Sequence, residues 1–538
     1  MKKIIALMFL VTVFVACKKS FFDINENPNS PTDVNITPNL LAPGALTTSG
    51  NINTGATYLR TVGGVGTRTR VDQLGRWLGI WSTNTFYASG DESKYITTNA
   101  SSNADWRNRY DNINDYSVML KKANETNQTF YAGIARIMKA WNYHQLVDLY
   151  NNVPYKEAVN PEIIQPKYDN GATIYADLFN EITEGINSIK GADLTKNIGI
   201  STSDVMFKGN KAKWAKFGNT LKLRLLIHLS QLPTSAATAG TQLAIIDAEG
   251  SGYLIENETA SVNPGYTAAN ANPFWTTYMY GTGCSAVPNN FNRANNFALN
   301  TMKSLNDERF KYFYLPVRGL PGTSNSDWKG VDYAPLVSSP ATKEDQLSDV
   351  GGSRSCISGT QGLGKSPEMS SWIITSFESL FLQAEAKSRG WITTGPTAET
   401  LYKRAVTESF VWLNVKRDAN LLAMPPISAI SPAQYASDYL AQTDAKIAWP
   451  AGPNDQIKTI AWQRFLAFNG NNHLEIYNDY RRLGVSAVPI PLSTDPGRGS
   501  NPIPFRLLYP ETEYSFNNSN ATSQGSINPS TSKVFWNQ

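Results

Sequence analysis

Apolar residues that recur every three or four positions run through several long segments of this sequence, and they constrain its fold more than any other feature. Such a stripe occupies one face of an α-helix and packs against a neighbour. The clearest stripe, in residues 132–150, consists of Ile134, Ile137, Met138 and Trp141. Two more lie in residues 211–229 (Trp214, Phe217, Leu221, Leu225) and 371–391 (Ile373, Phe377, Leu380, Phe381, Ala384). Because further helices are predicted around residues 107–124, 171–190, 397–416 and 457–468, we expect a mainly all-α chain.

Glycine, proline, asparagine and serine are scattered through long polar segments between these helices, such as residues 231–272, 318–366 and 493–504. They are not concentrated at one boundary, so no interdomain linker is evident, although 538 residues is long for a single core. We therefore expect one body over residues 17–538, with helices interrupted by long loops and few short strands. Helix pairs joined by short turns are typical of solenoid repeats, but the sequence shows no fixed period.

The first 16 residues are predicted to be a secretory signal. Lys2 and Lys3 precede an apolar run that is too short to span a bilayer as a helix. The sequence Phe-Val-Ala-Cys that ends at Cys17 resembles the bacterial lipobox, in which the chain is cut before the cysteine and acylated there. We expect a lipid anchor at Cys17 and a flexible tether to about residue 30. A plain signal peptide is the alternative, because Phe14 stands where leucine, isoleucine or valine is usual.

The charge balance and the cysteine content exclude other classes of protein. The chain has 48 Lys and Arg against 44 Asp and Glu, and this near-neutral balance argues against a nucleic-acid partner. No stretch after Cys17 is long and apolar enough to cross a membrane. Cys284 and Cys356 are the other cysteines, which is too few for a disulfide scaffold, and the sequence does not decide whether they pair.

Residues with the potential for metal binding or catalysis are few. The three histidines, His144, His228 and His473, lie on separate predicted helices without a carboxylate or cysteine at ligand spacing, so no metal-binding residues and no cofactor are predicted. The sequence does not decide whether a structural calcium is bound. Residues 359–366 match the phosphate-loop pattern, but no apolar run precedes them to form the required strand, which predicts a surface loop. Four acidic residues that could pair for glycoside hydrolysis are predicted to form salt bridges between helices instead: Glu378, Glu385, Glu475 and Asp479.

Aromatic residues gather in two segments outside the predicted helical stripes, residues 77–95 and 272–283, with amide and acidic groups nearby (Asn84, Asp91, Asn272, Asn289 and Asn290). Sugars bind proteins by stacking their apolar face on aromatic rings while polar groups contact the hydroxyl rim. The predicted ligand-binding residues are Trp81, Asn84, Phe86, Tyr87, Trp275, Tyr278 and Tyr280, with Trp328 from a third loop. The alternative is that these aromatics hold long loops against the helical body.

Stretches far apart in the chain resemble the SusD and RagB family of Bacteroidetes outer-membrane lipoproteins. They are residues 21–31 (FFDINENPNSP), 135–159 (with LVDLY and VPY), 366–391, 475–484 (EIYNDYRRLG) and 503–514 (IPFRLLYPETEY). The resemblance covers essentially the whole mature chain. It implies an all-α core of four tetratricopeptide-like helix pairs under a loop-rich, ligand-binding face.

The resemblance also implies a role without catalysis. The chain would be lipid-anchored at the outer membrane and exposed at the cell surface, with the periplasmic side as the alternative location. It would be the lid of a SusC-like TonB-dependent transporter and would bind an oligosaccharide, or a peptide as in some relatives. An anchored glycoside hydrolase is a competing hypothesis from another class, and the sequence does not identify the ligand.

Overall fold

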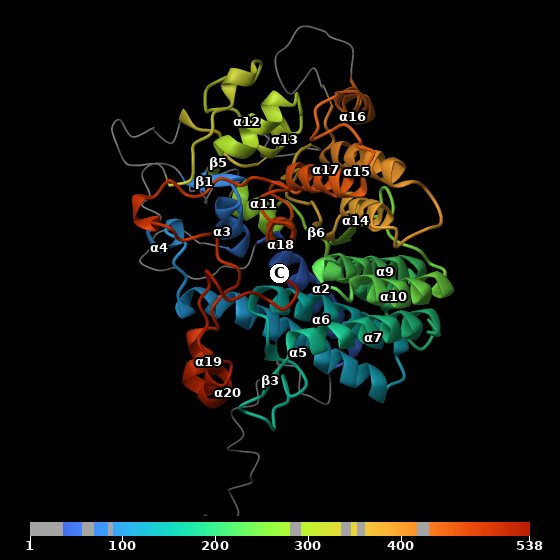
Figure 1. The fold of residues 1–538 in the computed structure, drawn as a ribbon. Helices are drawn as coiled ribbons and strands as arrows, with labels where there is room; N and C mark the ends of the chain where they lie inside the picture. The colour runs from blue at the N-terminus through green and yellow to red at the C-terminus, as the bar shows by residue number, and fades with distance from the viewer. Residues whose placement is uncertain are drawn as a thin grey trace, which may run out of the picture.

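The computed structural model of the protein describes residues 36–55, 69–83, 90–279, 292–334, 346–351, 361–416 and 430–537. These residues form a mainly helical body, which confirms the predicted fold class (Figure 1). The first half contains α2 (Pro38–Thr54), α3 (Arg70–Trp77), α4 (Gly90–Ser93), α5 (Asn103–Glu125), α6 (Thr129–Tyr150), α7 (Gly171–Lys190), α8 (Ile200–Ser203), α9 (Lys211–His228) and α10 (Ser235–Glu249). The second half contains α11 (Pro273–Tyr278), α12 (Asn296–Ser304), α13 (Phe310–Phe313), α14 (Ser376–Ser388), α15 (Ala398–Leu413), α16 (Pro432–Leu440), α17 (Pro453–Ala467), α18 (His473–Leu483), α19 (Glu511–Phe516) and α20 (Asn518–Thr522).

The long helices of the first half stack in sequence order. α5 packs against α6, α6 against α7, and α7 against α9. The sequence of α7 explains its part in this stack, because Ile174, Leu178, Ile182 and Ile186 recur every four residues and are all buried. Its start is fixed by Asn170, whose side chain accepts hydrogen bonds from the backbone N–H groups of residues 172 and 173. α7 therefore has one buried face and a beginning fixed by a side-chain cap.

Two glycines allow α6 and α7 to come into backbone contact. A Cβ atom at Gly133 would lie 2.5 Å from the carbonyl oxygen of Gly185. In turn, a Cβ atom at Gly185 would lie 3.0 Å from the carbonyl oxygen of Gly133 and 2.7 Å from the Ile137 side chain. Any other residue at either position would force the two helices apart.

Replacement of Gly133 by alanine is therefore expected to destabilise the protein by about 1–3 kcal/mol, the usual cost of overpacking a core. Gly240 in α10 is a matched control, because a Cβ atom there would meet nothing within 4 Å. Gly240→Ala is expected to stabilise the protein by about 0.5–1 kcal/mol, since alanine is the better helix former. Urea denaturation of both variants measures the difference, and equal midpoints would show that the α6–α7 contact adapts.

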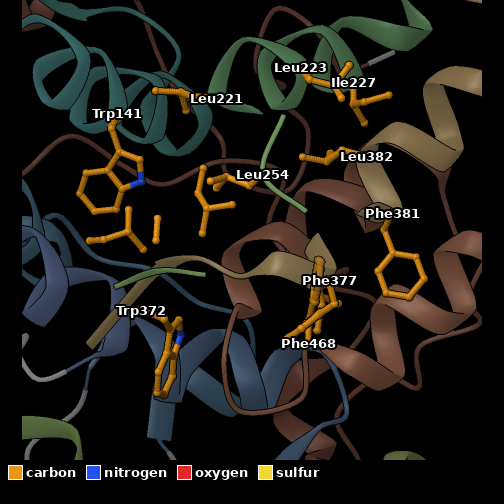
Figure 2. Packing of buried hydrophobic residues seen from close by; sticks show 14 of the residues in the cluster. Trp141, Leu221, Leu223, Ile227, Leu254, Trp372, Phe377, Phe381, Leu382 and Phe468 are labelled. Carbon is orange, nitrogen blue, oxygen red and sulfur yellow. The ribbon is translucent and has the colours of Figure 1, made fainter. Parts of the chain in front are cut away.

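The second half of the body is organised around α14. This helix packs against α15 and α17, and it also contacts α9 of the first half. Figure 2 shows Phe377 and Phe381 of α14 near Phe468, with centroid distances to the Phe468 ring of 5.9 and 6.3 Å, and Leu382 facing Ile227 of α9. One continuous hydrophobic cluster runs through both halves.

The described strands form two-stranded antiparallel sheets: β1 (Trp81–Thr83) with β5 (Asn292–Ala294), β2 (Val153–Pro154) with β3 (Tyr168–Asp169), and β4 (Ala260–Val262) with β6 (Ser371–Ile374). Residues 371–374 were predicted as the start of a helix, which is wrong, because they pair with β4 and α14 begins only after Thr375. Residues 235–249, predicted as loop, form the alanine-containing helix α10. Among the described helices, none combines the length and apolar character that a membrane span requires.

Candidate functional site

The β1–β5 pair brings the two predicted aromatic segments to one place. Thr83, the last residue of β1, pairs with Asn292, the first residue of β5. The chain therefore enters residues 84–89 and leaves residues 280–291 at adjacent backbone positions. Residues 84–89 thus begin, and residues 280–291 end, at the same point of the body, although about two hundred positions separate them in the sequence.

A buried carboxylate connects the elements around this point. Tyr278 of α11 donates its hydroxyl hydrogen bond to Asp72 Oδ1 at 2.9 Å, and Asn292 Nδ2 donates to the same oxygen at 2.8 Å. Asp72 also accepts a hydrogen bond from the backbone N–H of Thr69 at the start of α3. Burial raises the pKa of the Asp72 carboxyl above its usual range, against the opposing effect of Arg76. Asp72 therefore joins α3, α11 and β5.

Arg76 extends these contacts to α4. Its guanidinium lies 2.6 Å from Glu92 Oε1 and donates to Asn292 Oδ1 at 2.8 Å. The Tyr333 hydroxyl donates to Glu92 Oε1 at 2.9 Å. The result is a buried network of hydrogen bonds next to the β1–β5 pair. We call it the junction network: Asp72, Arg76, Glu92, Tyr278 and Asn292.

The structure buries four of the residues that were predicted to contact a ligand, with exposed fractions of 0% for Trp81 and 2% for each of Trp275, Tyr278 and Trp328. The Trp81 ring contacts the rings of Tyr278, at a centroid distance of 5.5 Å, and His473, at 4.6 Å. Trp328 donates its indole N–H to the carbonyl of residue 314 at 2.9 Å. Because the body covers these rings, their assignment as ligand-stacking residues is corrected: they hold loops against the helical body.

The other predicted site residues have different outcomes. Asn272 is buried and caps α11 by accepting hydrogen bonds from the N–H groups of Phe274 and Trp275, so it is not a rim group. Asp91 is exposed. The predictions for Asn84, Phe86, Tyr87, Tyr280, Asn289 and Asn290, and those for Cys17, Cys284 and Cys356, fall outside the described residues.

Asp72, Arg76 and Asn292 are not among the residues predicted from the sequence. One local signal for Asp72 was present, because Thr69 and Asp72 form a capping box, the threonine-x-x-acid pattern that starts a helix. Arg76 and Asn292 carry no comparable signal, since their partners are 16 and 220 positions away in the chain.

A second group of buried charges lies in the middle of the body and joins helices from both halves. Arg224 of α9 lies 2.5 Å from Glu378 of α14, and Arg482 of α18 lies 2.5 Å from Glu385 of α14. These contacts confirm the prediction that the acidic residues form salt bridges between helices. We call the group the ion network: Asp148, Arg224, His228, Glu378, Glu385, Arg464, Glu475, Asp479 and Arg482.

His228 lies between two carboxylates of the ion network. Its Nδ1 is 3.2 Å from Asp148 Oδ2, and its Nε2 is 3.0 Å from Glu475 Oε2. Burial alone would lower the pKa of His228, but Glu475 and Asp148 outweigh it and raise the pKa to about 9. His144 lies 6.2 Å away, ring to ring, and burial lowers its pKa to about 3. The two histidines therefore carry opposite protonation states at neutral pH.

The phosphate-loop pattern has a structural use in the described part of the chain. Lys365 donates a hydrogen bond to the carbonyl of Trp412, and its ammonium lies 4.8 Å from the centroid of the Trp412 ring. Residues 361–364, which precede it, form no strand, but they are buried, so the predicted surface loop is wrong for this part of the pattern. Within the described ranges, no group of three or more histidine, cysteine, aspartate or glutamate residues is arranged to hold a metal ion.

The described residues define a mainly helical protein, and comparison with known families identifies the family. Residues 56–510 match the SusD-like family, which is described as starch-binding and associating with the outer membrane. The chain therefore belongs to the SusD-like family, as the sequence resemblance predicted. No match was found among curated proteins.

Solved structures share the fold over nearly the whole chain. A SusD homologue from Bacteroides fragilis is 18% identical with a TM-score of 0.70, and the alignment covers 94% of this chain and 100% of that one. A chitin-binding protein is 22% identical with a TM-score of 0.68, covering 92% and 99%. A chitin-binding SusD homologue from Flavobacterium johnsoniae is 18% identical with a TM-score of 0.69, covering 92% and 98%.

Proposed function

We propose that this chain is a non-enzymatic, glycan-binding lipoprotein, anchored at the outer membrane through Cys17 and acting as the lid of a SusC-like TonB-dependent transporter. The observation that supports this function is the match of residues 56–510 to a family described as starch-binding and associating with the outer membrane. The description of two structurally similar proteins as chitin-binding agrees with an oligosaccharide as the ligand. The mature protein would be a single body over residues 17–538.

The glycan site that we propose lies where residues 84–89 and 280–291 adjoin the β1–β5 pair. Asn84, Phe86, Tyr87 and Tyr280 supply the aromatic faces and the polar group that a sugar requires. The junction network next to Thr83 and Asn292 is buried and its members are joined by hydrogen bonds, and a buried network of this kind holds the ends of the β1–β5 pair in place.

The carboxylates that could have supported the competing hydrolase hypothesis are engaged in ion pairs inside the body. Glu378, Glu385 and Glu475 are each about 1% exposed and paired with arginine or histidine in the core. Asp479 is paired with Arg464 and Arg482. General acid and base residues of a glycosidase must reach the scissile bond, which residues enclosed in this way do not do.

A peptide ligand is the alternative within the family.

Titration calorimetry with maltooligosaccharides, chitooligosaccharides and oligopeptides tests the proposed ligand. A double variant, Phe86→Ala with Tyr87→Ala, is expected to bind the glycan at least about tenfold more weakly, because removing a stacking aromatic from a binding site costs 1 kcal/mol or more. Phe516→Ala on α19 is the control, since this 72% exposed side chain lies outside the proposed site. Binding of peptides alone would replace the glycan with a peptide ligand.

Purification of the tagged lipoprotein from its native outer membrane tests the lid role separately. We expect a TonB-dependent barrel to copurify in a stoichiometric amount. If glycan binds but no barrel copurifies, the chain is a free-standing binder and the lid role is wrong.

A further inference from the structure

Residues 534–537 insert into the middle of the body although they belong to no helix or strand. Val534, Trp536 and Asn537 are buried, whereas Lys533 just before them is exposed. The chain end marked C lies over the centre of the view in Figure 1, near the label of α18. A short segment outside any helix or strand therefore has three of its four residues buried in the body.

Trp536 reaches the ion network directly. Its indole N–H donates a hydrogen bond of 2.9 Å to Asp148 Oδ1, the carboxylate whose other oxygen faces His228. The Arg481 guanidinium lies 4.8 Å from the centroid of the Trp536 ring and 4.0 Å from that of Tyr477, so it is held between two aromatic faces. Trp536 therefore supplies one hydrogen bond and one aromatic wall to a group of buried charges.

The residue before Trp536 contacts a strained part of the backbone. The N–H of Phe535 donates a 2.7 Å hydrogen bond to the Asn151 side chain, and its ring contacts Tyr175 at a centroid distance of 5.2 Å. Asn151 ends α6 with φ 70° and ψ −94°, a conformation close to the rare γ-turn. Such conformations cost of order 1–3 kcal/mol and persist only where surrounding contacts hold them. The hydrogen bond from Phe535 is one of the contacts that hold Asn151 in this conformation.

One helix, α18, links this contact to α3, the helix that carries Asp72 and Arg76 of the junction network. α18 carries Arg481, which packs on Trp536, at its C-terminal end. At its first residue it carries His473, which packs edge-on against Trp81 and whose Nδ1 lies 2.7 Å from the carbonyl oxygen of Val71 in α3. The position of α18 therefore depends on residues 534–537 at one end and supports α3 and β1 at the other.

We propose that residues 534–537 are a latch, a segment that opens locally while the remaining helices stay folded and whose closure fixes α18. The open latch leaves a binding site for a peptide that carries the same Phe-Trp pair, with Asp148, Asn151, Tyr175 and Arg481 as its walls. Residues 534–537 lie outside every helix and strand and are held by side-chain contacts and the Phe535 N–H bond to Asn151, so their opening breaks no helical or sheet hydrogen bond. The latch is a property of the body and does not depend on which ligand the proposed site binds.

Hydrogen exchange on the full-length chain with Trp536→Ala tests the latch. Amides of α18 and of residues 144–151 are expected to exchange at least about tenfold faster than in the unchanged chain, while those of α15 keep their protection. Trp536→Phe keeps an aromatic ring without the donor to Asp148 and is expected to give an intermediate rate. Phe516→Ala is the control and is expected to change none of these rates.

A fluorescent peptide with the sequence of residues 529–538 provides the second readout. It is expected to bind the Trp536→Ala chain and to restore protection in α18, and not to bind the unchanged chain, whose own latch fills the site. Faster exchange in every helix of Trp536→Ala, including α15, would show that the segment is part of the global core and would overturn the proposal. Unchanged exchange in α18, or equal binding of the peptide to both chains, would overturn it as well.

Discussion

Replacing Glu475 by alanine is expected to lower the free energy of unfolding by about 3–5 kcal/mol, the cost of removing one partner from a buried ion pair. Glu475 is 3.0 Å from His228 and 3.3 Å from Arg464, and Arg224 lies 3.9 Å away. The substitution would leave these buried cations with less negative charge around them and no water to replace it. Guanidinium denaturation followed by circular dichroism measures the loss.

Glu399→Ala is the matched control for this experiment. Glu399 pairs with Lys403 at 2.7 Å, but both side chains are about half exposed, and pairs of this kind contribute about 0.3–0.5 kcal/mol. A loss below about 1 kcal/mol in Glu475→Ala would mean that the ion network rearranges around the missing carboxylate, and would contradict the expected loss.

The stability of the folded chain is expected to fall between pH 6.5 and pH 8. The pKa of His228 is about 9 in the folded chain and about 6.5 in the unfolded chain, so its contribution is complete below pH 6.5 and is lost as the pH rises toward 9. One proton held only by the folded state corresponds to about 1.4 kcal/mol per pH unit, or on the order of 2 kcal/mol over this range. Above pH 8, Lys222 and Lys365 oppose the trend, because burial lowers the pKa of each to about 8.

The acid side of the stability profile has a different origin. Burial lowers the pKa of His144 to about 3 and that of His473 to about 4, so below pH 6.5 the unfolded chain binds protons that the folded chain does not. Stability should therefore be greatest near pH 6.5 and decline on both sides. Denaturation midpoints at a series of pH values test this profile. His228→Gln should remove the decline between pH 6.5 and 8, and a decline that persists in this variant would assign it to another group.

The sequence predicted the helices well because their stripes are local. The segments that became α6, α9 and α14 show their buried face within four turns of chain, and no distant residue is needed to recognise it. Residues 371–374 were mistaken for helix because their apolar side chains suit either structure. Their pairing with β4, more than one hundred positions earlier, decides in favour of a strand.

The aromatic residues were harder to place for the same reason. Trp81 ends a short apolar run that showed no clear helical stripe, and its burial involves Tyr278 and His473, which are about two hundred and four hundred positions away. The sequence shows that aromatic residues are available for sugar binding. It does not distinguish rings that pack a loop against the body from rings that a loop exposes to a ligand. The salt bridges were predicted as a class, whereas the pairing of Glu475 with His228 requires the folded chain.

The pairing of Thr83 with Asn292 has a consequence for how ligand preference can diversify. Residues 84–89 begin and residues 280–291 end at this pair, and the hydrogen bonds that fix it, through Asp72 and Arg76, lie inside the body. Substitutions, insertions or deletions between the attachment points leave those bonds intact. If the proposed site is correct, substitutions in these two segments are expected to change ligand preference without refolding the body.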